Sequence, residues 1–203
     1  MILPSSYFSS IFQFALIAQE KKYEIEYYEH FIKQSFRSRC EIYGANGKLS
    51  LVVPLQKRRN NTPIQNIKVS YEEKWQHLHW KSIESAYRAS PYFEFYEEDL
   101  KPLVFLKIES LLERNQVLET EIKSLLGITT EVVQTSLYSP SQPDYREKIH
   151  PKNKDLLLAV KFPKYIQVFE EKDGFIPNLS ILDLVFNLGP ESKSYLQNIH
   201  NPF

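Results

Sequence analysis

The sequence contains only one cysteine, Cys40, and only five glycines in 203 residues. One cysteine excludes an intramolecular disulfide framework and fits a reducing compartment. We expect Cys40 to be a buried structural thiol rather than a nucleophile, and we expect no metal site. The few glycines form neither a GxGxxG nor a GxxxxGK pattern, which excludes a standard phosphate-binding loop. No GxSxG is present either, so an α/β-hydrolase is excluded, and no cofactor can be named.

The sequence also lacks net charge and any long apolar run. Its 25 basic and 25 acidic residues cancel, which removes whole-molecule attraction to nucleic acid or to an anionic membrane. The apolar run from Ile11 to Ala18 is too short to span a bilayer and has no basic residue before it. These features predict a cytoplasmic protein without a transmembrane segment. The balanced charge also argues against a nucleic-acid partner. These features say nothing of the oligomeric state.

What the chain does contain is a large aromatic and aliphatic content, with 13 Tyr and 13 Phe among 42% apolar residues. Such a chain can bury one core, and we predict one domain over residues 1–203. A helix over Ile11–Gln19 capped by Ser9 or Ser10, followed by a strand over Tyr23–Tyr28, favours an α/β fold. Asn46-Gly47 between two apolar runs predicts a hairpin. The predicted architecture is a mixed β-sheet flanked by helices.

Further elements follow from local signals. Ser70 and Glu73 have capping-box spacing and predict a helix that runs to about Ala89. Asp99 and Pro102 predict the start of another helix that continues to Leu126. The segments Ile64–Val69 and Tyr165–Phe169 are predicted strands. Residues 138–155, with three prolines and many charges, predict a long loop.

The densest group of polar residues lies just after the predicted strand Tyr23–Tyr28. It comprises Glu29, His30, Lys33, Gln34, Arg37 and Arg39. Active sites of layered α/β proteins are commonly built at strand ends, and Arg recognises carboxylate or phosphate while His or Glu can move a proton. One interpretation is a binding site for an anionic or carboxylate-bearing ligand. The other is a strand pair with a solvated polar face.

Two further basic segments also allow either a ligand-binding site or a solvated surface. Lys57-Arg58-Arg59 is typical of a solvated loop, and the second segment, residues 146–154, mixes bases with acids. Together they could line a phosphate or sugar-nucleotide site. Tyr92, Phe93, Phe95 and Tyr96 favour a loop held in the core by its rings, with an aromatic ligand wall as the alternative. Single-stranded nucleic-acid binding would need those rings beside the basic loop.

Motifs along nearly the whole chain resemble the bacterial WbqC-like family. They read ILPSSYF, YEHFIKQSFRSRC, GKLSLVVPL, AYRASPYFEFY, DYREKIHPK and GFIPNLSILDLVFNLGP. The resemblance implies a role near O-antigen or other surface-polysaccharide synthesis, as a transferase of an activated sugar or an amino acid such as glycine. Many members carry two aspartates where this chain has Glu29-His30, which makes a carboxylate-pair metal site less expected here.

Carried over by position, the resemblance and the residue pattern together give a set of candidate site residues. His30 and Glu29 are the candidate general bases. The candidate substrate-binding residues are Tyr7, Lys33, Gln34, Arg37, Arg39, Arg146, Lys152 and Asp183. The expected ligand is a small, anionic, sugar-nucleotide-like molecule. The alternative function is a non-catalytic binding or scaffold protein of a polysaccharide-assembly complex, which would expose a broad aromatic patch near Tyr92–Tyr96 instead of a polar cleft.

Overall fold

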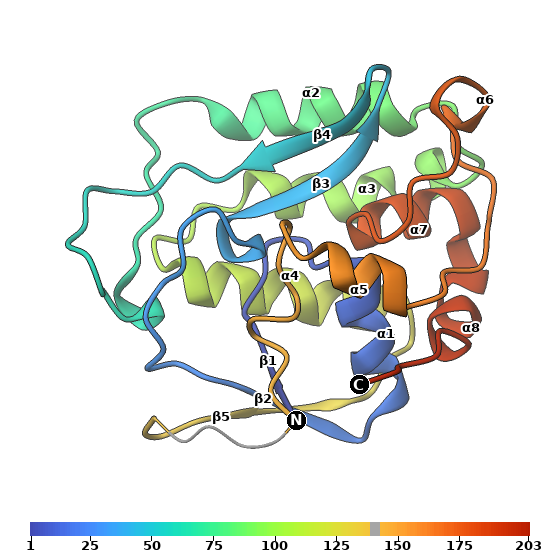
Figure 1. Cartoon of the computed structure of the whole chain (residues 1–203). Coiled ribbons are helices and arrows are strands. Elements are labelled where there is room, and N and C mark those ends of the chain that lie inside the picture. The colour runs from blue at the N-terminus through green and yellow to red at the C-terminus, as the bar shows by residue number, and fades with distance from the viewer. Residues whose placement is uncertain (139–142) are drawn as a thin grey trace.

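The strands form two separate sheets in the computed structural model, which describes residues 1–138 and 143–203 (Figure 1). Three strands are parallel in the order β1–β2–β5, and two form the antiparallel hairpin β3–β4. The strands are β1 (Ile2–Leu3), β2 (Lys22–Ile25), β3 (Arg39–Gly44), β4 (Gly47–Val52) and β5 (Glu131–Gln134). The α/β class is confirmed, with helices packed around small parallel and antiparallel sheets.

Eight α-helices accompany these strands in the described residues. They are α1 (Ile11–Gln19), α2 (Trp75–Tyr87), α3 (Phe93–Phe105), α4 (Leu111–Leu125), α5 (Lys154–Ala159), α6 (Glu170–Asp173), α7 (Ile181–Leu188) and α8 (Ser192–Gln197). Short 3₁₀ turns lie at Phe36–Ser38, Ile64–Asn66 and Gly189–Glu191. None of these helices combines the length and the hydropathy that a bilayer crossing needs. Part of the predicted 138–155 loop, residues 139–142, lies outside the described residues.

The first three elements form a parallel β–α–β unit, as the sequence predicts. Ser10 caps α1, because its Oγ accepts a hydrogen bond from the amide of Gln13 at 3.4 Å. Residues 11–17 are all buried, so α1 is covered on every side, and it packs against α7 and α8. The unit aligns β1 and β2, and therefore directs the residues that follow β2 to the carboxyl edge of the sheet.

The hairpin β3–β4 packs against α2 and α7 at the other side of the core (Figure 1). Gly47 has φ +90°, a conformation that glycine adopts without the strain a side chain would add. The predicted Asn46-Gly47 hairpin is confirmed. Cys40 of β3 is buried, also as predicted.

The predicted capping box at the start of α2 is wrong. The helix begins at Trp75 after Lys74, which provides no side-chain cap. The carbonyl of Ser70 instead accepts a hydrogen bond from Trp75 Nε1 at 2.9 Å. The predicted helix from Asp99 to Leu126 is also wrong: α3 begins earlier, at Phe93, and runs through Pro102 to Phe105, and residues 106–110 separate it from α4.

Two predicted strands are absent from the described residues. Ile64–Val69 contains a 3₁₀ turn after Pro63 and makes only isolated bridges, through Lys68 and Val69. Tyr165–Phe169 leads into α6 without pairing with a strand. Its alternating polar and apolar pattern arises because Tyr165 and Gln167 turn inward to hydrogen-bond a buried carboxylate, rather than because one face of a strand is solvated.

Candidate functional site

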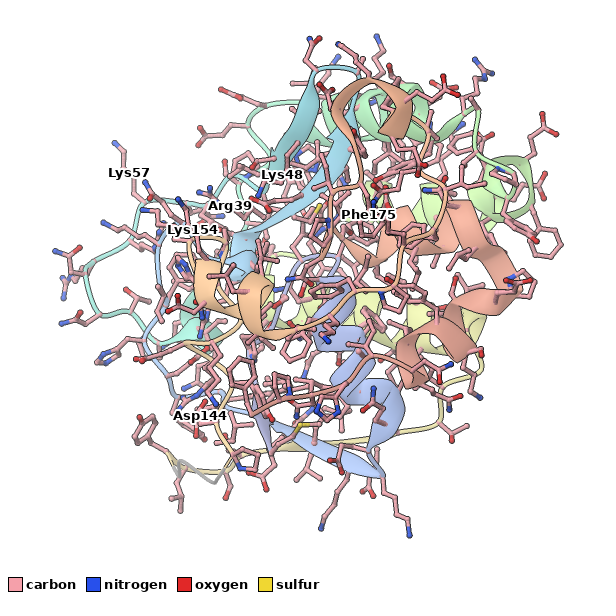
Figure 2. All side chains as sticks on the ribbon, turned by 45° about the vertical axis from the view of Figure 1, so that its right-hand side comes forward. Arg39, Lys48, Lys57, Asp144, Lys154 and Phe175 are labelled. Carbon is pink, nitrogen blue, oxygen red and sulfur yellow. The ribbon has the colours of Figure 1, made fainter. Side chains whose placement is uncertain are left out.

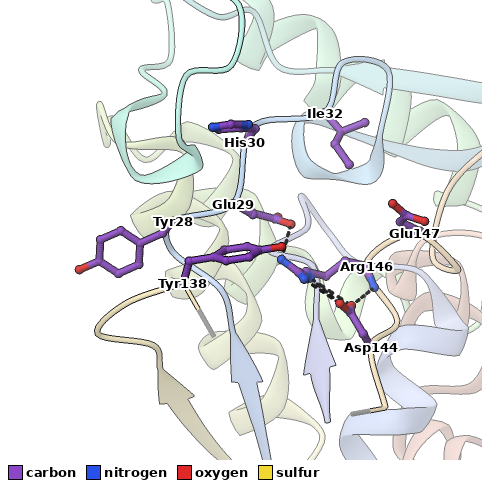
Figure 3. A pocket seen from close by; sticks show the side chains of 8 residues that line it. All are labelled: Tyr28, Glu29, His30, Ile32, Tyr138, Asp144, Arg146 and Glu147. Atoms are coloured by element: carbon purple, nitrogen blue, oxygen red, sulfur yellow. Dashed lines mark hydrogen bonds and ion pairs between the residues drawn. The ribbon is translucent and has the colours of Figure 1, made fainter. Parts of the chain in front are cut away.

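A pocket of about 790 Å³ lies beyond the carboxyl ends of the parallel strands. Figure 3 shows the strand arrowheads pointing toward it. It is lined by Tyr28, Glu29, His30, Ile32, Tyr138, Asp144, Arg146 and Glu147. The first four residues follow β2, Tyr138 follows β5, and Asp144 forms a parallel bridge with Ile2 of β1. The pocket thus occupies the place at which open α/β sheets commonly bind ligands.

The chain leaves β2 through a fixed turn. The buried Glu26 accepts hydrogen bonds from the amide of Tyr28 and from Thr135 Oγ1, both at 2.9 Å. Residues 29–31 then run antiparallel to residues 62–64. The amide of Ile64 donates to the carbonyl of Glu29, and the amide of Phe31 donates to that of Thr62, both at 2.9 Å. The edge of the pocket is therefore held by backbone hydrogen bonds.

Glu29 is fixed by a two-pronged ion pair with Arg37. Arg37 Nε lies 2.7 Å from Glu29 Oε1, and Nη2 lies 2.8 Å from Oε2. Arg37 is 1% exposed and Glu29 is 7% exposed. Asn115 of α4 supports this arrangement by donating to the carbonyl of Arg37 at 2.8 Å. Such bidentate pairs set both the position and the orientation of the two groups.

Arg146 joins this pair to a second carboxylate. Its Nη1 lies 3.3 Å from Glu29 Oε2, while its Nη2 lies 2.6 Å from Asp144 Oδ2. Although burial alone would raise it, hydrogen bonds from Arg146 lower the pKa of Asp144 below its ordinary value. Hydrogen bonding to Asp144 raises the pKa of the Arg146 guanidinium. Arg37, Glu29, Arg146 and Asp144 thus form one row of alternating charges, which we call the charge row.

His30 differs from the charge row in being free. Its side chain is exposed, and its ring makes no hydrogen bond to another residue in the described part of the chain. Figure 3 shows the ring turned away from the Glu29 carboxylate and toward the edge of the pocket. An imidazole in this state can accept a proton from a ligand, whereas Glu29 already accepts three hydrogen bonds from guanidinium groups.

Four other candidate residues, Lys33, Gln34, Arg39 and Lys152, do not line the pocket. Lys152 Nζ donates to Gln34 Oε1 at 2.8 Å, so residues 28–39 and 144–152 meet a second time there. Lys33 points to another pocket and lies 3.5 Å from Asn60 Oδ1. Arg39 begins β3; in the view of Figure 2, its side chain lies on the same side of the molecule as Lys57 and Lys154. Burial lowers the pKa of the nearby His150, and the charges of Arg37, Lys152 and Arg39 lower it further.

Tyr7 and Asp183 lie in the core, away from the pocket. Both have exposed fractions of 0%. Tyr7 Oη lies 3.0 Å from His79 Nδ1, and the ring of Tyr7 faces the guanidinium of Arg114. Asp183 accepts hydrogen bonds from Tyr165 Oη at 2.5 Å and from Gln167 Nε2 at 2.8 Å. Neither side chain can reach a ligand in the pocket without a rearrangement of the core.

The pocket has more acid than base in its lining. Glu29, Asp144 and Glu147 line it with one guanidinium, that of Arg146, while Arg37, which does not line it, pairs with Glu29. This balance suits an amine or the hydroxyl groups of a sugar, and a phosphate would be repelled at close range. In residues 1–138 and 143–203, no three His, Cys, Asp or Glu side chains are grouped so that they could hold a metal ion.

Sequence reasoning missed Asp144, Tyr138 and Glu147 as lining residues. Tyr138 places its ring 5.7 Å from the Arg146 guanidinium. Asp144 precedes Arg146 by two residues, a spacing that allows the carboxylate to accept from both the amide and the side chain of the arginine. That local Asp-x-Arg pattern is the signal that could have identified Asp144. Contacts between residues far apart in the sequence, such as that of Arg146 with Glu29, leave no such local signal.

Comparisons with known proteins give the family but no activity. The chain is 27% identical to the "Uncharacterized protein Rv1507c" of Mycobacterium tuberculosis, over 97% of this chain and 96% of that protein. No solved structure matches the chain. The profile of the WbqC-like protein family matches residues 5–152, which include α1, β2, the segment 28–39 and the charge row. The chain therefore belongs to the WbqC-like protein family.

Proposed function

We propose that this protein is a transferase that moves an activated sugar or an amino-acid-type group onto an acceptor used in surface-polysaccharide synthesis. The observation that carries the proposal is the pocket at the carboxyl ends of β2 and β5, where a free imidazole stands beside a fixed charge row. Preorganised charges with one mobile proton acceptor are what group transfer to a hydroxyl or amine needs.

In this proposal His30 is the general base and Glu147 holds the acceptor beside the charge row. The carboxylate of Glu147 accepts hydrogen bonds from acceptor hydroxyl or ammonium groups, whereas both oxygens of Asp144 already accept from Arg146. Glu29 is a positioning residue, because both of its oxygens are already engaged by Arg37 and Arg146. Arg146 is the one guanidinium that lines the pocket, and it would stabilise negative charge that develops on the reacting group.

The exposed rings give less support to a non-catalytic scaffold. That function expects a broad aromatic patch near α3, but Phe93 and Tyr96 are buried and Tyr92 is only partly exposed. Phe95, at 70%, is the one strongly exposed ring of this group. Figure 1 places the start of α3, where these rings occur in the sequence, at the right of the view and the loop that follows β4 at the left, which argues against a joint nucleic-acid surface.

The test is a thermal-shift screen of sugar nucleotides, amino acids and acyl donors, followed by mass spectrometry for a transferred group. We expect a stabilising ligand whose turnover is lost in His30→Gln. The matched control is His77→Gln, which removes another exposed histidine, on α2 and outside the pocket. A ligand that binds and reacts equally well in both variants would place the site elsewhere and overturn the proposal.

A further inference from the structure

A second pocket lies on the other side of the chain segment that follows β2. It has a volume of about 400 Å³ and is lined by Phe31, Lys33, Arg58, Arg59, Asn60, Asn61 and Thr62. His30 lines the first pocket and Phe31, the next residue, lines the second. Residues 30 and 32 line the first pocket and residues 31 and 33 line the second, as expected when successive side chains of an extended segment point to opposite sides, so this one backbone segment separates the two pockets.

The second pocket has the opposite charge balance to the first. It contains three cations and no carboxylate, and its amide and hydroxyl groups can also donate hydrogen bonds. Lys33, Arg58 and Arg59 form no ion pair with any acidic side chain in the described part of the chain. Three neighbouring cations without an acidic partner repel one another, and an anion relieves that repulsion.

The loop is organised rather than merely charged. The guanidinium of Arg58 lies 4.4 Å from the centre of the Phe31 ring, which orients its planar donor face. Thr62 Oγ1 donates to the carbonyl of Arg59 at 2.8 Å and closes the turn, in which Asn61 has φ 57°. The amide of Phe31 is bound to Thr62. One short antiparallel ladder therefore fixes His30 and the cationic pocket relative to each other.

We propose that this second pocket binds the phosphate groups of a phosphorylated ligand, and that this ligand is the activated donor. Phosphate binding in this pocket does not depend on the proposed transferase function, whereas the role of the ligand as donor rests on that function. A volume of about 400 Å³ is within the range of small-molecule sites, which is roughly 300–1,000 Å³. Arginine binds phosphate through two parallel hydrogen bonds, which gives both affinity and orientation.

In the transfer step that we propose, the donor reaches from the second pocket past the segment that follows β2 to His30. His30 takes a proton from the acceptor hydroxyl or amine in the first pocket. The freed electron pair of that oxygen or nitrogen forms a bond to the donor carbon, while the bond from that carbon to the phosphate oxygen breaks. The electron pair of the broken bond leaves with the phosphate, whose negative charge is held by Lys33, Arg58 and Arg59.

Calorimetric titration of the full chain with inorganic pyrophosphate tests the binding claim. We expect Arg58→Gln/Arg59→Gln to weaken binding by about tenfold or more, since each lost charge-assisted contact is worth about a tenfold change in affinity. Lys57→Gln is the matched control, because it removes one charge from the same loop but does not line this pocket. Equal weakening by the double variant and by Lys57→Gln, or no binding at all, would overturn the proposal.

Further arms identify the ligand and separate the two proposals. Uridine diphosphate binding more tightly than pyrophosphate would assign the site to a nucleotide donor, and equal affinity would assign it to a phosphate group alone. A single-stranded oligonucleotide binding more tightly than both would overturn the small-ligand assignment. His30→Gln should leave pyrophosphate affinity unchanged. If pyrophosphate binds as expected but no transfer occurs, only the transferase function fails; if transfer occurs equally in Arg58→Gln/Arg59→Gln, only the phosphate pocket fails.

Discussion

Glu29 and Arg146 are 117 positions apart in the sequence, and their side chains meet at 3.3 Å beside the candidate pocket. The contact links the segment that leaves β2 to the segment that lies beside β1. Arg37 and Asp144 extend it on either side into the charge row. The pocket therefore depends on an ion-pair network that forms only when the sheet is assembled.

Removing Arg37 should destabilise the protein strongly. Arg37→Met leaves the buried Glu29 with a single, longer contact to Arg146, and breaking a buried pair in this way costs about 3–5 kcal/mol. Urea unfolding monitored by circular dichroism measures the loss. Arg88→Met is the control, because the Arg88–Glu84 pair is exposed and 3.7 Å long, and it should cost less than about 1 kcal/mol. Equal losses in the two variants would contradict the assignment of Glu29–Arg37 as a structural pair.

Tyr7 should affect stability and leave ligand binding unchanged. Tyr7→Phe removes the hydroxyl that lies 3.0 Å from His79 Nδ1, and an unsatisfied buried acceptor costs about 1–3 kcal/mol. Its ring and its packing remain. We expect a lower midpoint of urea unfolding with the same affinity for any ligand of the candidate pocket. Loss of affinity at unchanged stability would instead show that Tyr7 reaches the ligand.

Local signals predicted α1 and the hairpin correctly, although the signals at Ser70 and Asp99 misplaced the starts of α2 and α3. Ser10 and the apolar residues after it specify α1, and Asn46-Gly47 specifies the hairpin, because caps and turns depend on residues that are close in sequence. The strand Tyr165–Phe169 was predicted wrongly because its polar side chains bind Asp183, 18 positions beyond Tyr165. A two-residue period cannot distinguish solvent from a buried carboxylate.

In the candidate site, too, local signals were visible in the sequence and contacts between distant residues were not. The position after a strand pointed to Glu29 and His30, and the basic segment pointed to Arg146; all three line one pocket in the structure. The sequence could not show that both carboxylate oxygens of Glu29 are engaged in ion pairs, because its partners Arg37 and Arg146 do not belong to β2. Tyr7 and Asp183 came from the family resemblance, which marks positions without indicating whether their side chains are in the core.

Glu119 should make the protein less stable as pH rises. Burial raises the pKa of Glu119 from 4.5 to about 7, although Tyr23 and Lys123 act in the other direction. The folded chain therefore holds a proton that the unfolded chain has lost between these values, so this contribution is full below pH 4.5 and is lost as pH rises through about 7. Urea unfolding across this range should show Glu119→Gln gaining stability relative to wild type as pH rises. Glu121→Gln, an exposed change on the same helix, should show no such trend.

His79 should make the protein less stable as pH falls. Burial lowers the pKa of His79 from 6.5 to about 4, so the unfolded chain binds a proton that the folded chain excludes between these values. Its contribution is full above pH 6.5 and is lost as pH falls through about 4. Since His79→Phe has no proton to bind, we expect the stability difference between wild type and His79→Phe to shrink as pH falls over this range. Urea unfolding of His77→Phe, which changes an exposed histidine of the same helix, is the control. A constant difference for His79→Phe would mean that His79 is protonated equally in the folded and unfolded chains, which its burial opposes.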